Sequence, residues 1–286
     1  MNATPPTVFR ERRFTSQDGL DLYFRDYGDA NSARTPLICL GGLTRNSKDF
    51  HGIAARLSRD RRVLCPDYRG RGRSNYDPDP GNYRPDIYVG DVVHLMAAAN
   101  THRVVVVGTS LGGLIATGIA LARPSGLAGV ILNDIGPELP QAGVGRIAEY
   151  VGTALTFDTW DEAVVAYRQR YGAAFPNFGE SDWLELAEDT FHQGDDGRIR
   201  TDYDVAIAKS FGGPLPDLWA MYRAVRNIPV LAIRGALSDI LSAETFDKMA
   251  VEKPDLIRVT IPERGHTPQL NEPDAASAID TFLAQF

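Results

Sequence analysis

Cysteine and long hydrophobic runs are scarce in this sequence of 286 residues, and its 30 lysines and arginines are outnumbered by 37 acidic residues. Its 2 cysteines, Cys39 and Cys65, each lie in a short apolar run, so we expect two buried, reduced thiols rather than a disulfide framework. The net charge of −7 repels the phosphates of nucleic acids and anionic lipids. No stretch approaches the run of about twenty apolar residues that a membrane-spanning helix needs. The composition therefore argues against nucleic-acid and membrane partners.

Targeting and metal-binding patterns are also missing. The first residues, MNATPPTVFRERRF, lack the apolar stretch of a signal peptide, so we expect a cytoplasmic protein. Neither an H-E-x-x-H pattern nor paired C-x-x-C patterns occur, and no metal site is implied. Residues 70–74 (GRGRS) resemble a phosphate-binding loop but lack the Gly-Lys-Ser/Thr that completes that motif. We expect the arginines there to fix the loop.

What the chain does contain is an alternation of apolar strands and helical segments. Hydrophobic residues make up 43% and charged residues 23%, as in an ordinary globular protein. Strands are expected at residues 20–27 (half exposed, near a sheet edge), 36–41, 62–66, 103–107, 127–132, 229–235 and 256–261. Helices are expected at residues 49–57, 85–100, 111–122, 243–251 and 273–286. This order predicts right-handed parallel crossovers and an α/β sheet.

The stretch from residue 139 to residue 216 interrupts the alternation. It has no strand-length apolar run, and it combines helix-compatible segments with many aromatic residues. We expect a helical cap of residues 138–216 over one edge of the sheet, and a core domain of residues 1–137 and 217–286. The aromatic side chains are expected mostly to pack the interior of the cap, with some of them roofing an apolar pocket.

The pentapeptide Gly108-Thr-Ser110-Leu-Gly112 matches the nucleophile motif G-x-S-x-G. A run of valines at 104–107 precedes it as a buried strand, and the apolar helix 111–122 follows it. A strand-to-helix turn this tight admits only small residues beside the serine and holds its hydroxyl above the sheet, where the helix N-terminus favours negative charge. Ser110 could simply cap the helix, but its position between these elements predicts a nucleophile.

A serine hydroxyl needs a base to remove its proton, and a carboxylate to orient that base. Of the 5 histidines, His266 is the one that follows a late strand on a loop, where parallel sheets place their sites. Asp239, just past the strand 229–235, is the expected acid, because the chain order nucleophile, acid, histidine then fits an α/β scaffold. Asp134, after the strand 127–132, is the alternative acid, and otherwise a turn residue or helix cap.

A tetrahedral intermediate carries an oxyanion, which needs preorganised hydrogen-bond donors. The backbone N–H of Leu111 heads the helix beside the serine, and the N–H of Leu43 follows two glycines that let the backbone approach a ligand. We expect these two groups to form an oxyanion hole, although the glycines would also suit a simple turn. Arg45, close by, is a candidate partner for a substrate carboxylate, and a plain surface arginine fits the sequence equally well.

Together these motifs resemble the α/β-hydrolase superfamily along essentially the whole chain. The resemblance rests on Leu40-Gly-Gly-Leu43, Asp67–Ser74 (DYRGRGRS), Gly108–Gly112, Asp239 and Gly265-His266. It is greatest to the lidded branch of enol-lactonases, esterases, C–C bond hydrolases and epoxide hydrolases that act on small molecules. It implies an eight-stranded, mostly parallel sheet with a cap, and no cofactor.

Two positions refine this resemblance. Gly41 stands where many members carry the histidine of a His-Gly pair, and because the oxyanion donor is a backbone N–H, the function should survive the change. Epoxide hydrolases and haloalkane dehalogenases use an aspartate nucleophile, and Ser110 argues against both chemistries. The sequence thus predicts a serine hydrolase that cleaves a small-molecule carboxylic ester or lactone through an acyl-enzyme intermediate. The alternatives are a C–C bond hydrolase acting on a vinylogous keto acid and a non-enzymatic ligand-binding receptor. The substrate's identity and the oligomeric state stay open.

Overall fold

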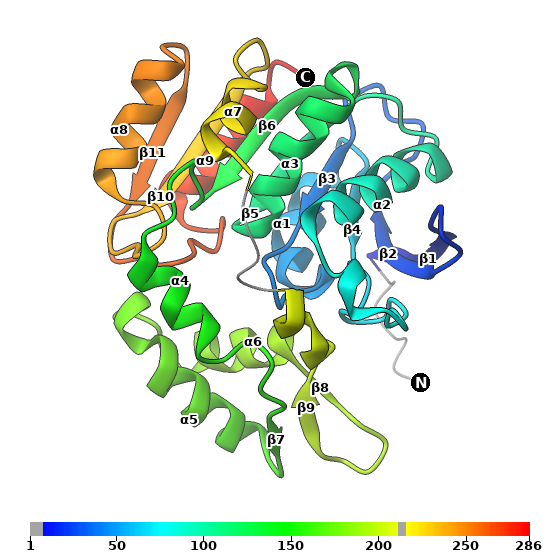
Figure 1. The fold of residues 1–286 in the computed structure, drawn as a ribbon, viewed down its shortest axis with the longest axis vertical. Coiled ribbons are helices and arrows are strands. Elements are labelled where there is room, and N and C mark those ends of the chain that lie inside the picture. Colours follow the sequence, from blue (N-terminus) through cyan, green and yellow to red (C-terminus); the bar gives the residue numbers. More distant parts are fainter. Residues whose placement is uncertain (1–7, 211–215) are drawn as a thin grey trace.

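The computed structural model describes residues 8–210 and 216–286, and eight strands within these ranges form one sheet in the order β1-β2-β4-β3-β5-β6-β10-β11 (Figure 1). The strands are β1 (Phe9–Thr15), β2 (Asp21–Tyr27), β3 (Leu37–Leu40), β4 (Val63–Pro66), β5 (Val104–Thr109), β6 (Leu127–Asn133), β10 (Val230–Gly235) and β11 (Ile257–Ile261). Only β2 runs antiparallel to its neighbours β1 and β4; the other adjacent pairs are parallel. The predicted eight-stranded, mostly parallel α/β sheet is confirmed.

Helices cover both faces of the sheet. One face packs against α2 (Pro85–Ala98), α3 (Leu111–Ala122), α7 (Leu218–Arg223) and α8 (Ala243–Glu252), and the other against α1 (His51–Leu57) and α9 (Pro273–Leu283). The β5 valines show why this strand is central: Val104 and Val106 enter the first core, and Val105 and Val107 the second. Since strand side chains alternate between faces, four consecutive valines leave neither face polar.

The edge strand β1 is absent from the sequence-based prediction. It pairs with β2 along its whole length, so that β2 is mostly buried rather than half exposed at the edge. The β1 sequence FRERRFT exposes most of its side chains. Strands are read from alternating apolar residues, and β1 has too few of them to be recognised.

Elements between β6 and α7 form a layer below the carboxyl ends of the strands (Figure 1). This layer, residues 138–210, is called the cap segment below. It contains α4 (Gln141–Ala148), α5 (Trp160–Tyr171), η4 (Gly172–Ala174), α6 (Glu180–Thr190) and η5 (Val205–Ser210), and three short strands, β7 (Thr156–Phe157), β8 (Phe191–Gln193) and β9 (Ile199–Thr201). Residues 211–215 of the predicted cap lie outside the described residues, and the boundaries of the two predicted domains stay predictions.

The cap segment differs from the expected all-helical insertion in one respect. Its three short strands form a small antiparallel sheet in the order β7-β9-β8. Strands of two or three residues are too short to produce a recognisable apolar run, which is why the sequence did not reveal them. The aromatic side chains Tyr167, Phe175, Trp183 and Phe191 form a separate hydrophobic cluster with their neighbours, as expected for residues that pack the interior of the cap.

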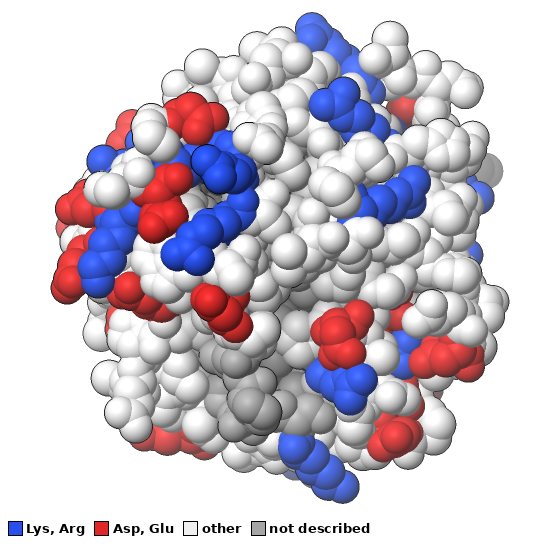
Figure 2. Space-filling view, turned by 45° about the horizontal axis from the view of Figure 1, so that its top comes forward, with Lys and Arg blue, Asp and Glu red and all other residues white. Residues whose placement is uncertain are grey.

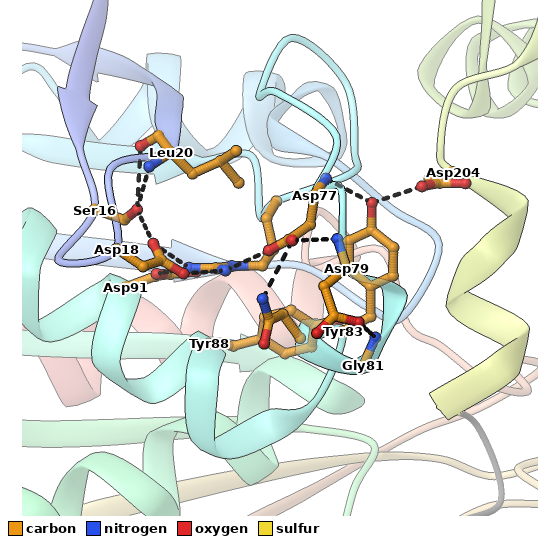
Figure 3. A network of polar contacts seen from close by, with 12 residues as sticks. Ser16, Asp18, Leu20, Asp77, Asp79, Gly81, Tyr83, Tyr88, Asp91 and Asp204 are labelled. Atoms are coloured by element: carbon orange, nitrogen blue, oxygen red, sulfur yellow. Dashed lines mark hydrogen bonds and ion pairs between the residues drawn. The ribbon is translucent and has the colours of Figure 1, made fainter.

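The arginine-rich loop after β4 is fixed by buried ion pairs (Figure 3). The completely buried side chain of Arg69 donates hydrogen bonds to three carboxylates, those of Asp18 (2.7 Å), Asp77 (2.6 Å) and Asp91 (2.6 Å). The hydrogen bond from Arg69 lowers the pKa of Asp18 to about 2. Arg69 therefore fixes the loop, as expected from the sequence, and it joins the loop to the β1–β2 turn and to α2.

The same loop also holds the cap segment. The Tyr83 hydroxyl donates to Asp204 at 2.6 Å, as Figure 3 shows, and the Asp204 N–H donates to the Gly70 carbonyl at 2.7 Å. Two residues further along the loop, the Gly72 N–H donates to the carbonyl of Asp202 at 2.9 Å. These bonds cross from the core sheet to residues 202–204 and fix where the cap segment rejoins the core.

The molecular surface carries interleaved charges on the face shown in Figure 2, with lysines and arginines lying beside acidic residues. Ion pairs account for this mixture around α8: Lys248 pairs with Glu244 at 2.9 Å, and Arg258 with Asp247 at 2.6 Å. Of the helices within the described ranges, none combines the length and the apolar character needed to cross a bilayer. Cys39 and Cys65 are buried and not disulfide-bonded, as the sequence predicts.

Candidate active site

Ser110 occupies a strained turn between β5 and α3. Its backbone has φ 53° and ψ −115°, a conformation that residues with a side chain rarely adopt. A Cβ atom at Gly108 would lie 2.5 Å from the backbone of Gly112, and one at Gly112 would lie 2.1 Å from the carbonyl oxygen of Leu40. Both flanking positions therefore require glycine, which is the physical basis of the motif seen in the sequence.

The structure brings Ser110 together with His266 and Asp134. The Ser110 Oγ lies 2.9 Å from His266 Nε2, and the other ring nitrogen, Nδ1, lies 2.8 Å from Asp134 Oδ2. Asp134 follows β6 directly, and β6 adjoins β5, so both residues emerge at the same edge of the sheet. With the proton on Nδ1 donated to Asp134, Nε2 is free to accept the serine proton.

Further donors hold the Asp134 carboxylate, which is completely buried. The backbone N–H of Gly235 donates to Oδ1 at 2.8 Å, and the hydroxyl of Ser238 donates to Oδ2 at 2.6 Å. Hydrogen bonds of this kind stabilise an ionised carboxylate and fix its orientation. Asp134 is thus held in place from β10 and the loop that follows it, independently of His266.

The structure contradicts the expectation that Asp239 orients His266. The Asp239 carboxylate pairs instead with Arg146 of α4, at 2.6 Å. Helix α4 packs closely on this loop, since a Cβ at Gly143 would lie 2.3 Å from the Asp239 carbonyl oxygen. Arg146 lies on the same helical face as Gly143 and binds the carboxylate. The loop thus reaches the site through Ser238, which sequence reasoning overlooked, and the contact with the histidine comes from the alternative acid, Asp134.

Contacts with the cap segment hold the His266 loop. The Gly265 N–H donates to the Ala174 carbonyl in η4 at 2.7 Å, and a Cβ at Gly265 would lie 2.6 Å from Ala174 Cβ. On the other side, the Asn133 amide donates to the Pro268 carbonyl at 2.9 Å. The position of the imidazole therefore depends on both the cap segment and the end of β6.

The two backbone groups expected to form an oxyanion hole flank the serine. Leu111 is the first residue of α3, where N–H groups have no partner within the helix. The loop before Leu43 passes close to the nucleophile, as a Cβ at Gly42 would lie 3.9 Å from Ser110 Cβ. Among the described residues, neither the Leu43 N–H nor the Leu111 N–H has a hydrogen-bond acceptor. Both remain available as donors.

A cavity of about 110 Å³ opens above Ser110 and His266. Its lining combines core residues with cap-segment side chains, among them Ile147, Tyr150, Tyr167, Tyr171, Phe175 and Leu186. Burial raises the pKa values of the Tyr150 and Tyr171 hydroxyls, which therefore stay neutral. The cavity thus combines aromatic and aliphatic side chains of the cap segment with many polar and charged groups, and such convergent polar groups are what fix the orientation of a small-molecule ligand.

Arg45 lies in this cavity, but its guanidinium is already bound. Its Nε and Nη2 donate to the two carboxylate oxygens of Asp49 at 2.7 and 2.6 Å, and its Nη1 donates to the Tyr167 hydroxyl and to Thr190. Although burial opposes its charge, Asp49 raises the pKa of Arg45 above the usual value. Arg45 is therefore not a plain surface residue, and a substrate carboxylate would have to compete with Asp49.

Two acidic residues of the cavity were missed from the sequence. Asp49 stands four residues after Arg45, a spacing at which opposite charges often pair, so the pattern held a signal for it. Asp189, near the end of α6, has no such signal, because its place in the cavity depends on how the cap segment folds. No group of three or more potential metal ligands occurs within residues 8–210 and 216–286.

Comparison with known proteins identifies the family of this chain. The model of the alpha/beta hydrolase family matches residues 37–279, most of the chain. The chain belongs to this family. The superfamily predicted from the sequence motifs is confirmed, and the protein is a hydrolase of the α/β type.

Several relatives share nearly the full length of this α/β hydrolase. A 3-hydroxybutyrate-oligomer hydrolase from Cupriavidus necator is 37% identical, over 92% of both chains. A 2-(acetamidomethylene)succinate hydrolase from Mesorhizobium japonicum is 28% identical, over 86% of this chain and 87% of that one. The crystal structure of an alpha/beta hydrolase from Novosphingobium aromaticivorans superimposes with a TM-score of 0.93 at 43% identity, covering 98% of this chain and 99% of the other.

Proposed function

We propose that this α/β hydrolase cleaves a small-molecule carboxylic ester through an acyl-enzyme intermediate on Ser110. The observation that carries the proposal is the chain of hydrogen bonds Ser110–His266–Asp134, which begins at a strained turn and opens into a cavity. A serine, a base within hydrogen-bond distance and a buried carboxylate behind that base are the parts needed to activate a hydroxyl nucleophile.

In the acylation step, His266 Nε2 takes the proton of Ser110 as Oγ attacks the ester carbonyl carbon. Asp134 stabilises the imidazolium that forms, and the N–H groups of Leu43 and Leu111 donate to the developing oxyanion. When the tetrahedral intermediate collapses, the bond to the alcohol oxygen breaks. The imidazolium returns its proton to that oxygen, so the alcohol leaves as a neutral molecule and an acyl-serine remains.

Deacylation uses the same groups with water as the nucleophile. His266 removes a proton from the water, whose oxygen attacks the acyl carbon. The imidazolium then protonates Ser110 Oγ as the bond to the acyl group breaks, which releases the carboxylic acid. The enzyme thus ends the cycle in the protonation state in which it began, and every proton is transferred between Ser110, His266, the substrate and water.

Short linear esters of hydroxy acids are the substrate class we propose first. The relative from Cupriavidus necator is named as a hydrolase of 3-hydroxybutyrate oligomers, in which hydroxy acids are joined by ester bonds. That relationship supports ester hydrolysis over the lactone and C–C alternatives. The small cavity above Ser110 suits short acyl and alcohol groups.

The test is a Ser110→Ala variant assayed with p-nitrophenyl butyrate. We expect kcat/KM to fall by about 10⁴-fold or more, with an unchanged unfolding temperature, because only the nucleophilic oxygen is removed. Ser125→Ala, at an exposed position before β6, is the matched control and should keep wild-type activity. Wild-type activity in the Ser110→Ala variant would refute the assignment.

A substrate panel separates the competing functions. Short esters, lactones and vinylogous keto acids are offered to the wild-type enzyme, and turnover of the esters is expected to be fastest. Preferential cleavage of the keto acid would favour the C–C hydrolase. A fluorophosphonate should label the wild-type protein but not Ser110→Ala, and absence of labelling together with ligand binding would favour the receptor.

A further inference from the structure

Asp189 stands out among the acidic residues that line the active-site cavity, because no side chain or backbone group of the described residues binds its carboxylate. It lies in the last turn of α6 and lines the same cavity as Ser110 and His266. Within the described part of the chain, its side chain makes no hydrogen bond or ion pair. Asp49 and Asp134, the other acidic residues in or beside the cavity, are both bound by several donors.

The two cations that act electrostatically on Asp189, Arg45 and Lys48, are already bound to other groups. Arg45 donates to both oxygens of Asp49, and its remaining bonds go to Tyr167 and Thr190. Lys48 pairs with Asp202 at 3.0 Å and donates to the backbone carbonyls of Glu188 and Phe191. Neither side chain forms a contact ion pair with Asp189, so its acceptor oxygens remain available to a molecule in the cavity.

The surroundings make an ionised Asp189 unfavourable. Burial, followed by the charge of Asp49, raises its pKa to about 6, while Arg45 and Lys48 lower that pKa and Glu185 raises it slightly. Its place at the C-terminal end of a helix adds a further repulsion, because the helix dipole is negative there. A carboxylate kept at a cost to stability and facing a catalytic cavity is typical of a ligand-binding group.

We propose that Asp189 is a specificity-determining residue that accepts a hydrogen bond from a hydroxyl group of the ester substrate. The inference rests on the proposed function and adds to it the substrate group that is recognised. A hydroxyl is a neutral donor, which suits an acceptor with no partner of its own. A substrate carboxylate placed beside Asp189 would meet two acidic residues, Asp49 and Asp189, against the single guanidinium of Arg45, so a hydroxyl is favoured at this position.

Two matched pairs of esters test the proposal. The pair p-nitrophenyl 3-hydroxybutyrate and p-nitrophenyl butyrate probes a hydroxyl on the acyl side, and the pair 3-hydroxypropyl butyrate and propyl butyrate probes the alcohol side. For one pair, the wild-type enzyme should prefer the hydroxylated ester by at least about tenfold in kcat/KM, the effect of one hydrogen bond to a charged group. The preference should fall in Asp189→Asn, and it should disappear in Asp189→Ala.

Two controls separate recognition from a general defect. In Asp189→Ala, kcat/KM for the hydroxylated ester should fall by at least about tenfold relative to kcat/KM for the matching plain ester, because a lost hydrogen bond affects only the substrate that makes it. Glu188→Gln removes a negative charge from the neighbouring, exposed position of α6, and it should leave the preference unchanged. The alanine variant of Ser110 is inactive on all four esters if the proposed function holds.

The dependence on pH gives a measurement that needs no variant. In the wild-type enzyme the ratio of kcat/KM for the hydroxylated and the plain ester should rise as the pH passes through about 6, because the ionised Asp189 is the better acceptor. Taking the ratio cancels any effect of pH that acts equally on both substrates. A change in the ratio therefore reports on Asp189, which binds only the ester that carries the hydroxyl.

Replacing Asp189 should raise the stability of the folded protein, whereas replacing a structural residue would lower it. The pKa of Asp189 in the folded protein is raised above the ordinary value of 3.8, so its charge destabilises the fold fully above about pH 6, and this effect is lost as the pH falls towards 4. Asp189→Asn should therefore raise the unfolding temperature at pH 7.5 and leave it unchanged near pH 4. A structural role predicts a lower unfolding temperature and equal losses on both esters.

The outcomes distinguish this inference from the function on which it rests. A wild-type enzyme without preference in either pair, or a preference that survives in Asp189→Ala, would overturn the role of Asp189 alone. Retained turnover in Ser110→Ala would overturn the proposed function instead. A lost preference for the hydroxylated ester and a raised unfolding temperature at pH 7.5 together support the role of Asp189.

Discussion

Replacing Asp134 or Asp239 with asparagine tests which carboxylate serves His266 in the proposed reaction. In Asp134→Asn, the side-chain oxygen can still accept the Gly235 N–H, while the amide nitrogen faces His266. An amide N–H beside Nδ1 requires that nitrogen to be an acceptor, which moves the ring proton to Nε2. Nε2 then has no free lone pair for the Ser110 proton, and general-base catalysis stops.

The expected magnitudes differ by orders of magnitude between the two variants. Loss of the correct histidine tautomer should reduce kcat by roughly 10⁴-fold, which corresponds to about 5.4 kcal/mol of transition-state stabilisation at about 1.36 kcal/mol per tenfold. Asp239→Asn removes only the ion pair with Arg146, whose side chain is 30% exposed while that of Asp239 is 41% exposed. Such a pair contributes about 0–1 kcal/mol to stability. Because the Asp239 carboxylate pairs with Arg146 and the bond to His266 Nδ1 comes from Asp134, kcat/KM should change by less than about threefold in this variant.

The assay measures kcat/KM for p-nitrophenyl butyrate, together with urea unfolding of each variant. Both proteins should fold, so that activity and stability are read independently. A thousandfold loss in Asp239→Asn, with Asp134→Asn near wild type, would show that the acid acts from the loop after β10. In that case the bonds between Asp134 and His266 would be structural.

Two further predictions concern stability. Gly112→Ala places a Cβ 2.1 Å from the Leu40 carbonyl oxygen and should destabilise the protein by about 3 kcal/mol or more. Gly52→Ala, whose Cβ would meet no atom outside its own helix within 4 Å, should stabilise helix α1 by about 0.5–1 kcal/mol. Both are measured by urea unfolding, and equal effects would contradict the close-packing argument. Arg69→Met leaves buried carboxylates without their cation and should cost about 3–5 kcal/mol, whereas Arg73→Met, at an exposed ion pair of the same loop, should cost less than about 1 kcal/mol. Similar losses in thermal unfolding would show that burial does not decide the difference.

The sequence alone was sufficient wherever the decisive interactions are local. Four valines in succession predict a strand buried on both faces, and the structure places β5 in the middle of the sheet. The glycines around Ser110 indicate the tight turn because the backbone itself leaves no room for a Cβ. His266 was recognisable from its place after a late strand, since parallel strands end at a common edge.

Tertiary structure decided everything that depends on the direction of a loop side chain. Asp134 and Asp239 follow neighbouring strands of the sheet, and the sequence favoured Asp239, whereas the contact with His266 comes from Asp134. Helix α4 packs on the loop after β10 and its Arg146 binds Asp239, which leaves Asp134, held by Gly235 and Ser238, to meet the histidine. Asp189 enters the cavity only because α6 folds back over the strand ends. Periodicity records which residues are buried, whereas the partners of polar side chains depend on contacts between segments far apart in the chain.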